Sequence, residues 1–396
     1  MNEILCGDVL QVLRTLPDNH VQCVVTSPPY WGLRDYGISG QLGLEATPEL
    51  YVQRMVEVFR EVRRVMRDDA TLFLNIGDSY ASSPAGNKEW KHGVIFDGRD
   101  MSGHHSAKAS HPGDGGAYGE NKPLMNFKAC GLKPKDLVGI PWMLAFALRA
   151  DGWYLRSEII WHKLNPMPES VTDRPTKSHE QIFLLTKSAS YFYDAEAIKE
   201  ASVYPDDDRK ARAQENHKSM PTGIIAGVRP GSATYPTRNA RSVWSFASQP
   251  YPGSHFATFP EELPRRCILA GTSEKGACPK CGSSWERVVK KSGGNTGKGW
   301  TDHKADSTEG LGQTYRADGV DDDGNGYKVE TLGWQPNCQC GETETRPCTV
   351  ADIFMGSGTV AEVAAKLGRN WLGVELNPKY IQLAKERLGL LALIKD

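Results

Sequence analysis

The chain has 396 residues, of which 39% are hydrophobic, so it can bury one large core with insertions or two smaller cores. Its 47 basic and 48 acidic side chains nearly cancel, so net charge identifies no partner and any affinity for nucleic acid must come from a local patch. No apolar run approaches the roughly 20 residues of a membrane-spanning helix, and the N-terminus lacks the pattern of a signal peptide, so we expect a cytoplasmic protein with no membrane partner.

Short apolar runs alternate with amphipathic stretches in the first 80 residues. Residues 21–25 (VQCVV) are typical of a buried strand, residues 48–67 have apolar side chains at helical spacing, and residues 71–76 (TLFLNI) return to strand character. Residues 136–163 predict a helix followed by a strand, and the last fifty residues repeat a strand–turn–helix pattern. These patterns predict an α/β fold with a Rossmann-like, doubly wound sheet.

Three irregular segments interrupt this pattern. Residues 82–135 collect Gly, Ser and Lys together with four of the ten histidines. Residues 200–243 contain the most basic stretch, with seven Lys or Arg against one acidic residue between Arg209 and Arg241. Residues 276–347 are rich in Gly and Asp and contain four cysteines. We expect these segments to be insertions in one sheet rather than separate domains.

The C-terminal segment has the pattern of a cofactor-binding turn. A strand that ends at residues 352–354 is followed by a glycine turn, GSG, at 356–358, and a helix opens near Thr359. Such a turn lets a ligand approach the backbone and directs free N–H groups at it. The next strand ends at Glu375, where an acid commonly holds ribose hydroxyls. A tight connection without a ligand is the alternative interpretation.

A second motif, TSPPY at residues 26–30, follows the strand at 21–25. Paired prolines remove two N–H donors and stiffen the turn, so a carbonyl can point into a cleft with no competing backbone partner. Tyr30 and Trp31 then offer flat faces. Hydrogen-bond acceptors beside an aromatic platform suit a flipped-out nucleobase, although the motif alone would favour a structural turn.

Taken together, TSPPY and DIFMGSGT (352–359) resemble the motifs of the amino-group DNA methyltransferases, which methylate the exocyclic nitrogen of cytosine or adenine. The catalytic motif precedes the cofactor glycines, a circularly permuted order that resembles the β group of that family. One departure is Ile353, which stands where the family has proline. Other segments that resemble family elements are residues 4–17, 159–194 and 255–271.

The resemblance implies a role for each motif residue. Ser27 and the Pro28 carbonyl accept the two amino hydrogens of an extruded base, Pro29 completes the turn, and Tyr30 stacks on the base. The implied methyl donor is S-adenosylmethionine, and the implied partner is double-stranded DNA, with a cognate restriction endonuclease as a second candidate partner. The residues expected to bind the methyl donor are Asp8, Asp352, Phe354, Gly356, Ser357, Gly358, Thr359, Glu375 and Asn377.

The resemblance also divides the chain into core segments and insertions. The expected core segments are 1–81 with the TSPPY loop, 136–199, 244–275 with a cofactor-side helix, and 348–396 with the S-adenosylmethionine-binding half. Residues 82–135 are expected to form a DNA-contacting loop and residues 200–243 a target-recognition region. A solvated, arginine-rich loop is the alternative for the second of these.

The residue before the two prolines bears on which base is methylated. A Ser in that place is associated in the family mainly with N4-cytosine enzymes and an Asp with N6-adenine enzymes, so Ser27 favours N4 of cytosine. An N6-adenine enzyme is the first alternative. A methyltransferase acting on RNA or protein amides, and a non-catalytic DNA-binding zinc protein, are the others.

The cysteines of the third insertion form two pairs, CPKCG at 278–282 and CQCG at 338–341. Four thiolates from Cys278, Cys281, Cys338 and Cys340 can close a tetrahedral structural zinc site, as in a zinc ribbon. The 56 residues between the pairs exceed what a compact ribbon needs, so four unliganded thiols are the alternative. Cys348 is a candidate substitute ligand, and we expect Cys6, Cys23 and Cys267 in the core.

Overall fold

The structure is a computed structural model, and it describes residues 2–33, 35–81, 95–96, 99–100, 130–201, 237–249, 259–292 and 328–392. The chain divides into two compact units. The first contains Met1–Asp194, Arg241–Trp285 and Pro336–Asp396, and the second contains Ala195–Ala240 and Glu286–Gln335. Within the described residues, no helix is both long enough and apolar enough to cross a bilayer.

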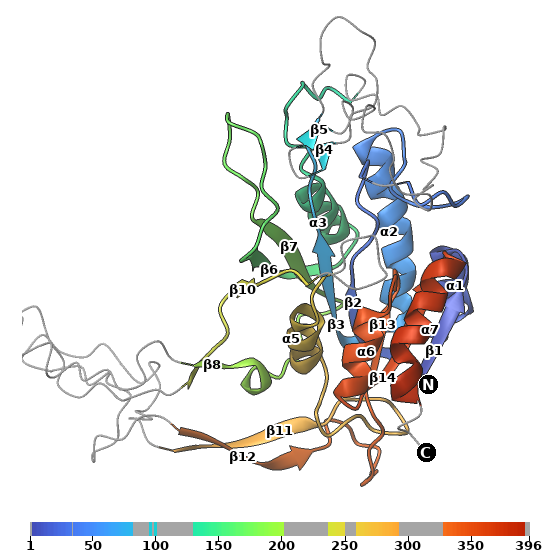
Figure 1. Ribbon diagram of the computed structural model, residues 1–396. Helices are drawn as coiled ribbons and strands as arrows, with labels where there is room; N and C mark the ends of the chain where they lie inside the picture. Colours follow the sequence, from blue (N-terminus) through green and yellow to red (C-terminus); the bar gives the residue numbers. More distant parts are fainter. Residues whose placement is uncertain are drawn as a thin grey trace, which may run out of the picture. The chain divides into compact units, whose positions relative to one another are not determined.

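An eight-stranded sheet forms the centre of the first unit (Figure 1). The strands lie in the order β1 (Asn2–Cys6), β14 (Asn370–Glu375), β13 (Thr349–Asp352), β2 (Val21–Thr26), β3 (Met66–Ile76), β7 (His179–Thr186), β6 (Tyr154–Lys163) and β10 (Val243–Phe246). In this sheet β7 pairs antiparallel with both neighbours, whereas the other neighbouring strands pair in parallel. The sheet is mostly parallel, and the predicted α/β fold with a doubly wound sheet is confirmed.

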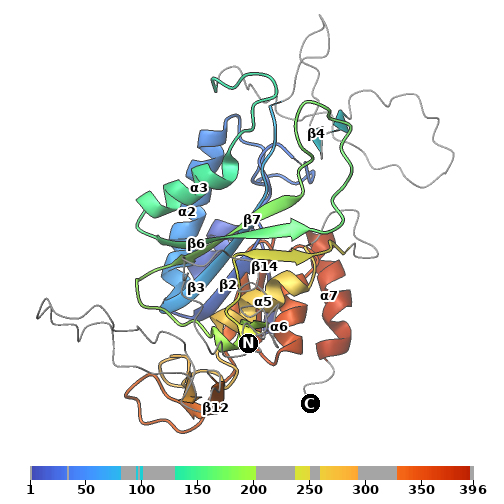
Figure 2. The same cartoon turned by 90° about the vertical axis from the view of Figure 1, so that its left-hand side faces the viewer.

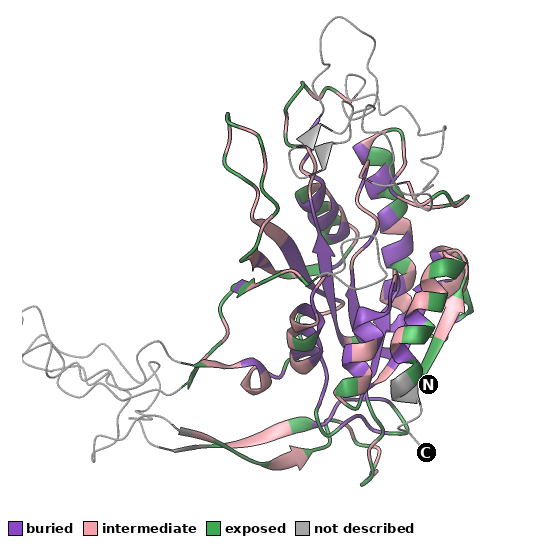
Figure 3. Cartoon of the chain, in the orientation of Figure 1, coloured by how far each residue is buried: buried purple, intermediate pink, exposed green. Residues whose placement is uncertain are grey.

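Helices cover both faces of this sheet (Figure 2). One face has α1 (Val9–Thr15), α2 (Pro48–Val65) and α3 (Ile140–Ala150), and the other has α5 (Glu262–Gly271), α6 (Thr359–Lys366) and α7 (Pro378–Ala392). Because water reaches neither face at the centre, every residue of β2 is buried, and the central strands are purple in Figure 3. This double coverage explains why residues 21–25 form a nearly continuous apolar run.

The chain reverses its direction of winding between β2 and β13. From β2 it passes through α2 to β3 on one side, and from β13 it passes through α6 to β14 on the other. In open α/β sheets this reversal leaves a crevice at the carboxyl ends of the strands, where ligands bind. The fold therefore predicts the site at the ends of β2 and β13.

The longest described helix on the first face, α2, forms where the apolar spacing of residues 48–67 predicted a helix. Thr47 caps it by accepting a hydrogen bond from the Leu50 N–H, and Pro48 occupies its first turn. The helix ends at Val65 rather than at 67, because Met66 already begins β3. Its apolar side chains, among them Tyr51, Met55 and Phe59, are buried against the sheet and α3.

Short antiparallel pairs make up the described part of the second unit. β11 (Glu286–Ser292) pairs with β12 (Lys328–Gln335), with a register shift between Val288 and Val289. A short 3-10 turn, η2 (Glu196–Ile198), precedes β8 (Glu200–Ala201), which pairs with β9 (Thr237–Arg238). Elsewhere in the chain β4 (Ile95–Phe96) pairs with β5 (Arg99–Asp100).

Much of the three predicted insertions lies outside the described residues. This holds for most of the expected DNA-contacting loop at 82–135 and for residues 202–236, which contain most of the basic stretch. It also holds for residues 293–327 between β11 and β12. The DNA-contacting roles of the first two segments stay predictions.

Close packing of α5 on the sheet yields a test of the fold. A Cβ added to Gly271 would lie 2.4 Å from Thr71 Oγ1 and 2.7 Å from Cys23 Sγ, so we expect Gly271→Ala to push α5 away from β2 and β3. The expected loss is about 1–3 kcal/mol in the free energy of unfolding, measured by urea denaturation. Gly389→Ala on α7 is the matched control, because nothing lies within 4 Å of the added methyl group. Equal stability of the two variants would contradict this packing.

Candidate active site

A cavity of about 740 Å³ lies at the carboxyl edge of the sheet. Its walls include residues that directly follow β1, β2, β3, β13 and β14, which are mutually parallel strands. This cavity therefore lies at the reversal point between β2 and β13. The volume is in the usual range for small-molecule and cofactor sites.

Most of the residues that the sequence singled out line this one cavity, although the two motifs are more than 300 positions apart. The lining members are Asp8, Ser27, Pro28, Pro29, Tyr30, Phe354, Gly356, Ser357, Thr359, Glu375 and Asn377. Ile353, which replaces the family's proline, is buried and also lines it. Asp352 and Gly358 do not line the cavity.

Asp352 does not line the cavity itself but connects the two turns that do, the SPPY turn and the glycine turn. Its Oδ1 accepts a hydrogen bond from Thr26 Oγ1 at 2.7 Å and another from the Phe354 N–H at 3.1 Å. Burial raises the pKa of Asp352 to about 7, and the nearby Glu375 adds to the effect. The end of β2, directly before Ser27, is thereby tied to the start of the glycine turn.

Glu375 holds the glycine turn against the end of β14. One carboxylate oxygen accepts a hydrogen bond from the Gly356 N–H at 2.8 Å, and the other accepts one from the Asn377 N–H at 2.7 Å. Burial raises the pKa of Glu375. Each oxygen keeps a free lone pair, so the carboxylate can also accept hydrogen bonds from ribose hydroxyls.

Gly358 has a different task from Gly356. It has φ +83° as the residue before α6, and a Cβ there would lie 3.1 Å from Ala384 Cβ on α7. Glycine is thus needed at this position for backbone conformation and for packing between helices. The lining residue Gly356, also at positive φ, has open space around it, since nothing would lie within 4 Å of an added Cβ.

The TSPPY turn is tied to α2 and the core. Pro29 O accepts a hydrogen bond from the Tyr51 hydroxyl at 2.9 Å. Trp31 is only 1% exposed, and its Nε1 donates to Glu45 O at 2.8 Å, so the expectation that Trp31 offers a flat face to a base is wrong. Its indole is part of the core on the α2 face, which fixes the turn. Tyr30 alone of the two aromatic rings reaches the cavity.

The Tyr30 ring packs against the backbone that follows β3. A Cβ on Gly77 would lie 2.5 Å from Tyr30 Cε2, so only glycine leaves room for the ring. The hydroxyl of Tyr30 donates to Glu180 Oε2 at 2.8 Å and accepts a longer hydrogen bond, 3.5 Å, from Ser27 Oγ. Burial raises the pKa of Tyr30, so the hydroxyl keeps its proton as a donor.

Glu180 is a site residue that the sequence did not single out. Besides Tyr30, it accepts a hydrogen bond from Asn75 Nδ2 at 3.1 Å and forms an ion pair with Lys163 Nζ at 2.7 Å. Burial opposes its ionisation, but the Lys163 charge and the three hydrogen-bond donors outweigh burial and lower its pKa. A buried carboxylate is thus kept ionised directly behind the tyrosine.

Sequence signals for this network were present but weak. Glu180 and Lys163 lie within residues 159–194, one of the segments that resemble elements of the methyltransferase family, and Asn75 is a polar residue in the apolar run TLFLNI. A second acid, Asp78, also lines the cavity, and it accepts hydrogen bonds from the Gly139 and Ile140 N–H groups at the start of α3. Burial raises the pKa of Asp78.

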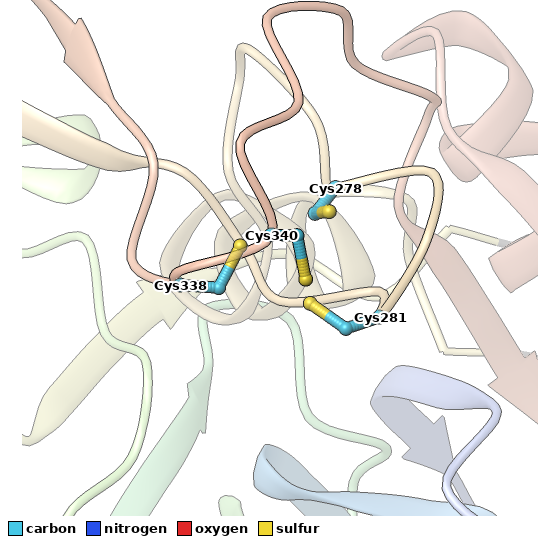
Figure 4. A group of neighbouring side chains, drawn as sticks. All are labelled: Cys278, Cys281, Cys338 and Cys340. Atoms are coloured by element: carbon cyan, nitrogen blue, oxygen red, sulfur yellow. The ribbon is translucent and has the colours of Figure 1, made fainter.

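The four predicted metal ligands converge at a second place in the first unit. The Sγ atoms of Cys278, Cys281, Cys338 and Cys340 all lie within 4.8 Å of one another, and Figure 4 shows their side chains turned toward a common centre. Cys348, the candidate substitute, is instead buried beside Ser284 Oγ.

The remaining cysteines divide by burial. Cys23 and Cys267 are buried in the core as expected. Cys6 is exposed, so its expected place in the core is wrong. It is the last residue of β1, the outermost strand on that side of the sheet, where no further described strand covers it.

Comparisons with known proteins bear on this cavity. A family model described as a DNA methylase matches residues 21–278 and 346–386, which include both motifs. The chain is 37% identical over 386 residues to the Type II methyltransferase M.SmaI of Serratia marcescens, with 98% of this chain and 90% of that protein covered. It is 38% identical over 382 residues to the Type II methyltransferase M.Cfr9I of Citrobacter freundii, with 96% and 86% covered.

Solved structures give a more distant likeness. The PvuII DNA methyltransferase, described as cytosine-N4-specific, aligns with a TM-score of 0.49 and 13% identity. The alignment covers 98% of this chain and 86% of that chain.

The raised pKa of Asp352 gives a test of its buried environment beside Thr26. The folded chain holds a proton on Asp352 up to about pH 7, whereas the unfolded chain releases it near pH 4, so this contribution to stability is full below about pH 4 and is lost as pH rises through 7. Asp352→Asn keeps an acceptor for Thr26 but cannot ionise. Relative to this variant, we expect the wild type to lose about 1 kcal/mol of unfolding free energy per pH unit between 4 and 7.

The measurement is urea unfolding of both proteins at several pH values. Asp18→Asn, which makes the same chemical change at an exposed position, is the control. Parallel curves for wild type and Asp352→Asn would show that Asp352 ionises normally.

Proposed function

This chain belongs to the N6/N4 DNA methylase family, and we propose that it methylates the exocyclic N4 of cytosine in double-stranded DNA. Membership makes it a DNA methyltransferase that uses S-adenosylmethionine. The proposal rests mainly on one observation, that the SPPY turn and the glycine turn line the same cavity. The hydrogen bond from Thr26 to Asp352 joins these two turns. Ser27 before the prolines favours cytosine over adenine, and N6 of adenine is the alternative.

The chemical difficulty is that an exocyclic amine is a poor nucleophile, since its lone pair is delocalised into the ring. In the proposed site Ser27 Oγ and Pro28 O accept the two amino hydrogens, which directs the nitrogen lone pair out of the ring plane. Ser27 Oγ can donate to Tyr30 and still accept from the amine, because a hydroxyl has two lone pairs. Neither Pro28 nor Pro29 has an N–H that would compete with the amine.

The other wall of the cavity fits the methyl donor. Glu375 has free lone pairs for ribose hydroxyls, the backbone at Gly356 can be approached closely, and Asp8 and Asn377 lie on the same wall. When bound, S-adenosylmethionine supplies the electrophile, which is the methyl carbon bonded to its cationic sulfur. The protein contributes mainly alignment of amine and methyl group, an effect that can reach about 7–11 kcal/mol.

The target base must leave the duplex to reach this cavity, at a cost of a few kcal/mol. Tyr30 provides a ring on which the base stacks, and Gly77 and Glu180 hold that ring in place. We propose that residues 82–135 and the basic residues of 200–243 contact DNA and offset the cost of extrusion. The relatives named above are Type II methyltransferases, so a restriction endonuclease of the same specificity is the proposed partner.

Methyl transfer to unmethylated genomic DNA, followed by digestion to nucleosides and mass spectrometry, tests the proposed function. We expect N4-methylcytosine, and we expect Ser27→Ala to lower kcat by about 100-fold or more, because the amine loses an acceptor in the transition state. N6-methyladenine without N4-methylcytosine would support the alternative base. Transfer to RNA or protein but not to DNA would reject the proposal.

A second test uses the two hydrogen bonds that run from Ser27 to Tyr30 and from Tyr30 to Glu180. Glu180→Gln removes the charge that accepts the Tyr30 hydrogen bond, and Tyr30→Phe removes the hydroxyl between Ser27 and Glu180, so we expect each to lower kcat about 10- to 100-fold with little change in the affinity for S-adenosylmethionine. The double variant should lose little more than either single variant, since both changes act on the same two hydrogen bonds.

Glu57→Gln on α2 is the matched control, because it makes the same substitution in an exposed ion pair away from the cavity. Binding of S-adenosylmethionine is measured by titration calorimetry and kcat by steady-state methyl transfer. Additive losses in the double variant would show that the two residues act separately.

A further inference from the structure

The four-cysteine cluster lies at the edge of the sheet opposite the cavity. The turn that contains Cys278 and Cys281 contacts the starts of β2 and β3, whereas the cavity lies beyond the carboxyl ends of these strands. On β2 the contact is made by Gln22, and Ser27 comes five residues later, or about 17 Å along an extended strand. A metal at this cluster is too far from the cavity to touch a substrate there.

The cysteine geometry fits one tetrahedral metal ion. Zn–S bonds of about 2.3 Å place the sulfurs of a tetrahedral site about 3.8 Å apart. The four Sγ atoms here lie within 4.8 Å of one another, so small rotations of the side chains close the site. The first pair is in a tight turn, in which the Gly282 N–H donates to Cys278 O and the Cys278 N–H donates to Ser283 O, both at 2.8 Å.

Gln22 connects this turn to the core of the fold. It is 3% exposed, its Nε2 donates to Gly282 O at 3.0 Å, and its Oε1 accepts from the Thr349 N–H, the first residue of β13, at 2.7 Å. One buried amide thus joins the turn to the two strands that carry the SPPY motif and the glycine turn. Arg67 at the start of β3 adds a hydrogen bond to Cys281 O.

The second cysteine pair approaches from a distant part of the chain. Ser283 Oγ donates to Asn337 O at 3.1 Å, directly before Cys338, and Ala277 and Arg346 exchange two backbone hydrogen bonds. Between Trp285 and Pro336 the chain belongs to the second unit. One cysteine pair therefore lies shortly before the segment Glu286–Gln335 and the other shortly after it, where the chain leaves and re-enters the first unit.

We propose that Cys278, Cys281, Cys338 and Cys340 bind one zinc ion that acts as a structural clamp on the amino edge of the sheet. The ion holds together the two chain segments that flank Glu286–Gln335. It also holds the Gly282 carbonyl against Gln22, and through Gln22 it stabilises the pairing of β2 with β13. The metal takes no part in methyl transfer. Its effect is on the stability of the core that aligns the two motifs.

Metal analysis of the full chain, purified under reducing conditions and reconstituted with zinc, tests the binding. We expect about one zinc per chain, with loss of the metal in Cys278→Ser and Cys338→Ser and retention in Cys6→Ser, the exposed non-ligand control. Cobalt in place of zinc should give thiolate charge-transfer absorption and the d–d bands of a tetrahedral site. Less than about half an equivalent of zinc, or disulfides between these cysteines, overturns the proposal.

The clamp is tested by comparing melting temperatures with and without metal. Removal of zinc by a chelator should lower the melting temperature of the wild type by several degrees. The shift should be clearly smaller in Gln22→Ala, because the link between the turn and the strands is already lost, and unchanged in the exposed control Gln53→Ala. An equal shift in Gln22→Ala and wild type overturns the clamp, whichever base the enzyme methylates.

Discussion

The hydrogen bond from Thr26 to Asp352 is the constraint on which the site depends. It joins residues 326 positions apart at the carboxyl ends of two neighbouring parallel strands. Ser27 follows Thr26 directly, and the glycine turn begins a few residues after Asp352, so this one bond sets the spacing between the SPPY turn and the cofactor turn. Because Asp352 is buried, the bond is shielded from competing water.

The two edges of the sheet have separate tasks. At the carboxyl edge, short turns present acceptors, glycines and one aromatic ring to a cavity. At the amino edge, Gln22 and Arg67 tie the same strands to a turn that contains two of the four clustered cysteines. Strands that are buried on both faces link these edges rigidly, so interactions at one edge help to hold the geometry at the other.

Buried carboxyl groups around the cavity differ in how their charge is balanced. Glu180 has a lowered pKa because the charge of Lys163 and the hydrogen bonds from Lys163, Tyr30 and Asn75 compensate for burial. Asp352 and Glu375 accept hydrogen bonds from neutral groups only, and burial raises the pKa of both. The cation Lys163 therefore decides which of these carboxylates stays most firmly ionised. A cationic methyl donor bound beside Glu375 would in turn favour the ionised form of that residue.

The sequence by itself determined the fold class and the two motifs, because apolar periodicity and the chemistry of Pro-Pro and Gly-Ser-Gly turns are local properties. It did not determine that Glu180 supports Tyr30, since that contact requires β7 to lie antiparallel beside β3 with Gln181 opposite Ile76. Nor did it place Trp31 in the core, because an aromatic residue after a strand fits either a cavity or a core. Only the tertiary structure decided these points, since strand order and register arise from pairing between distant segments.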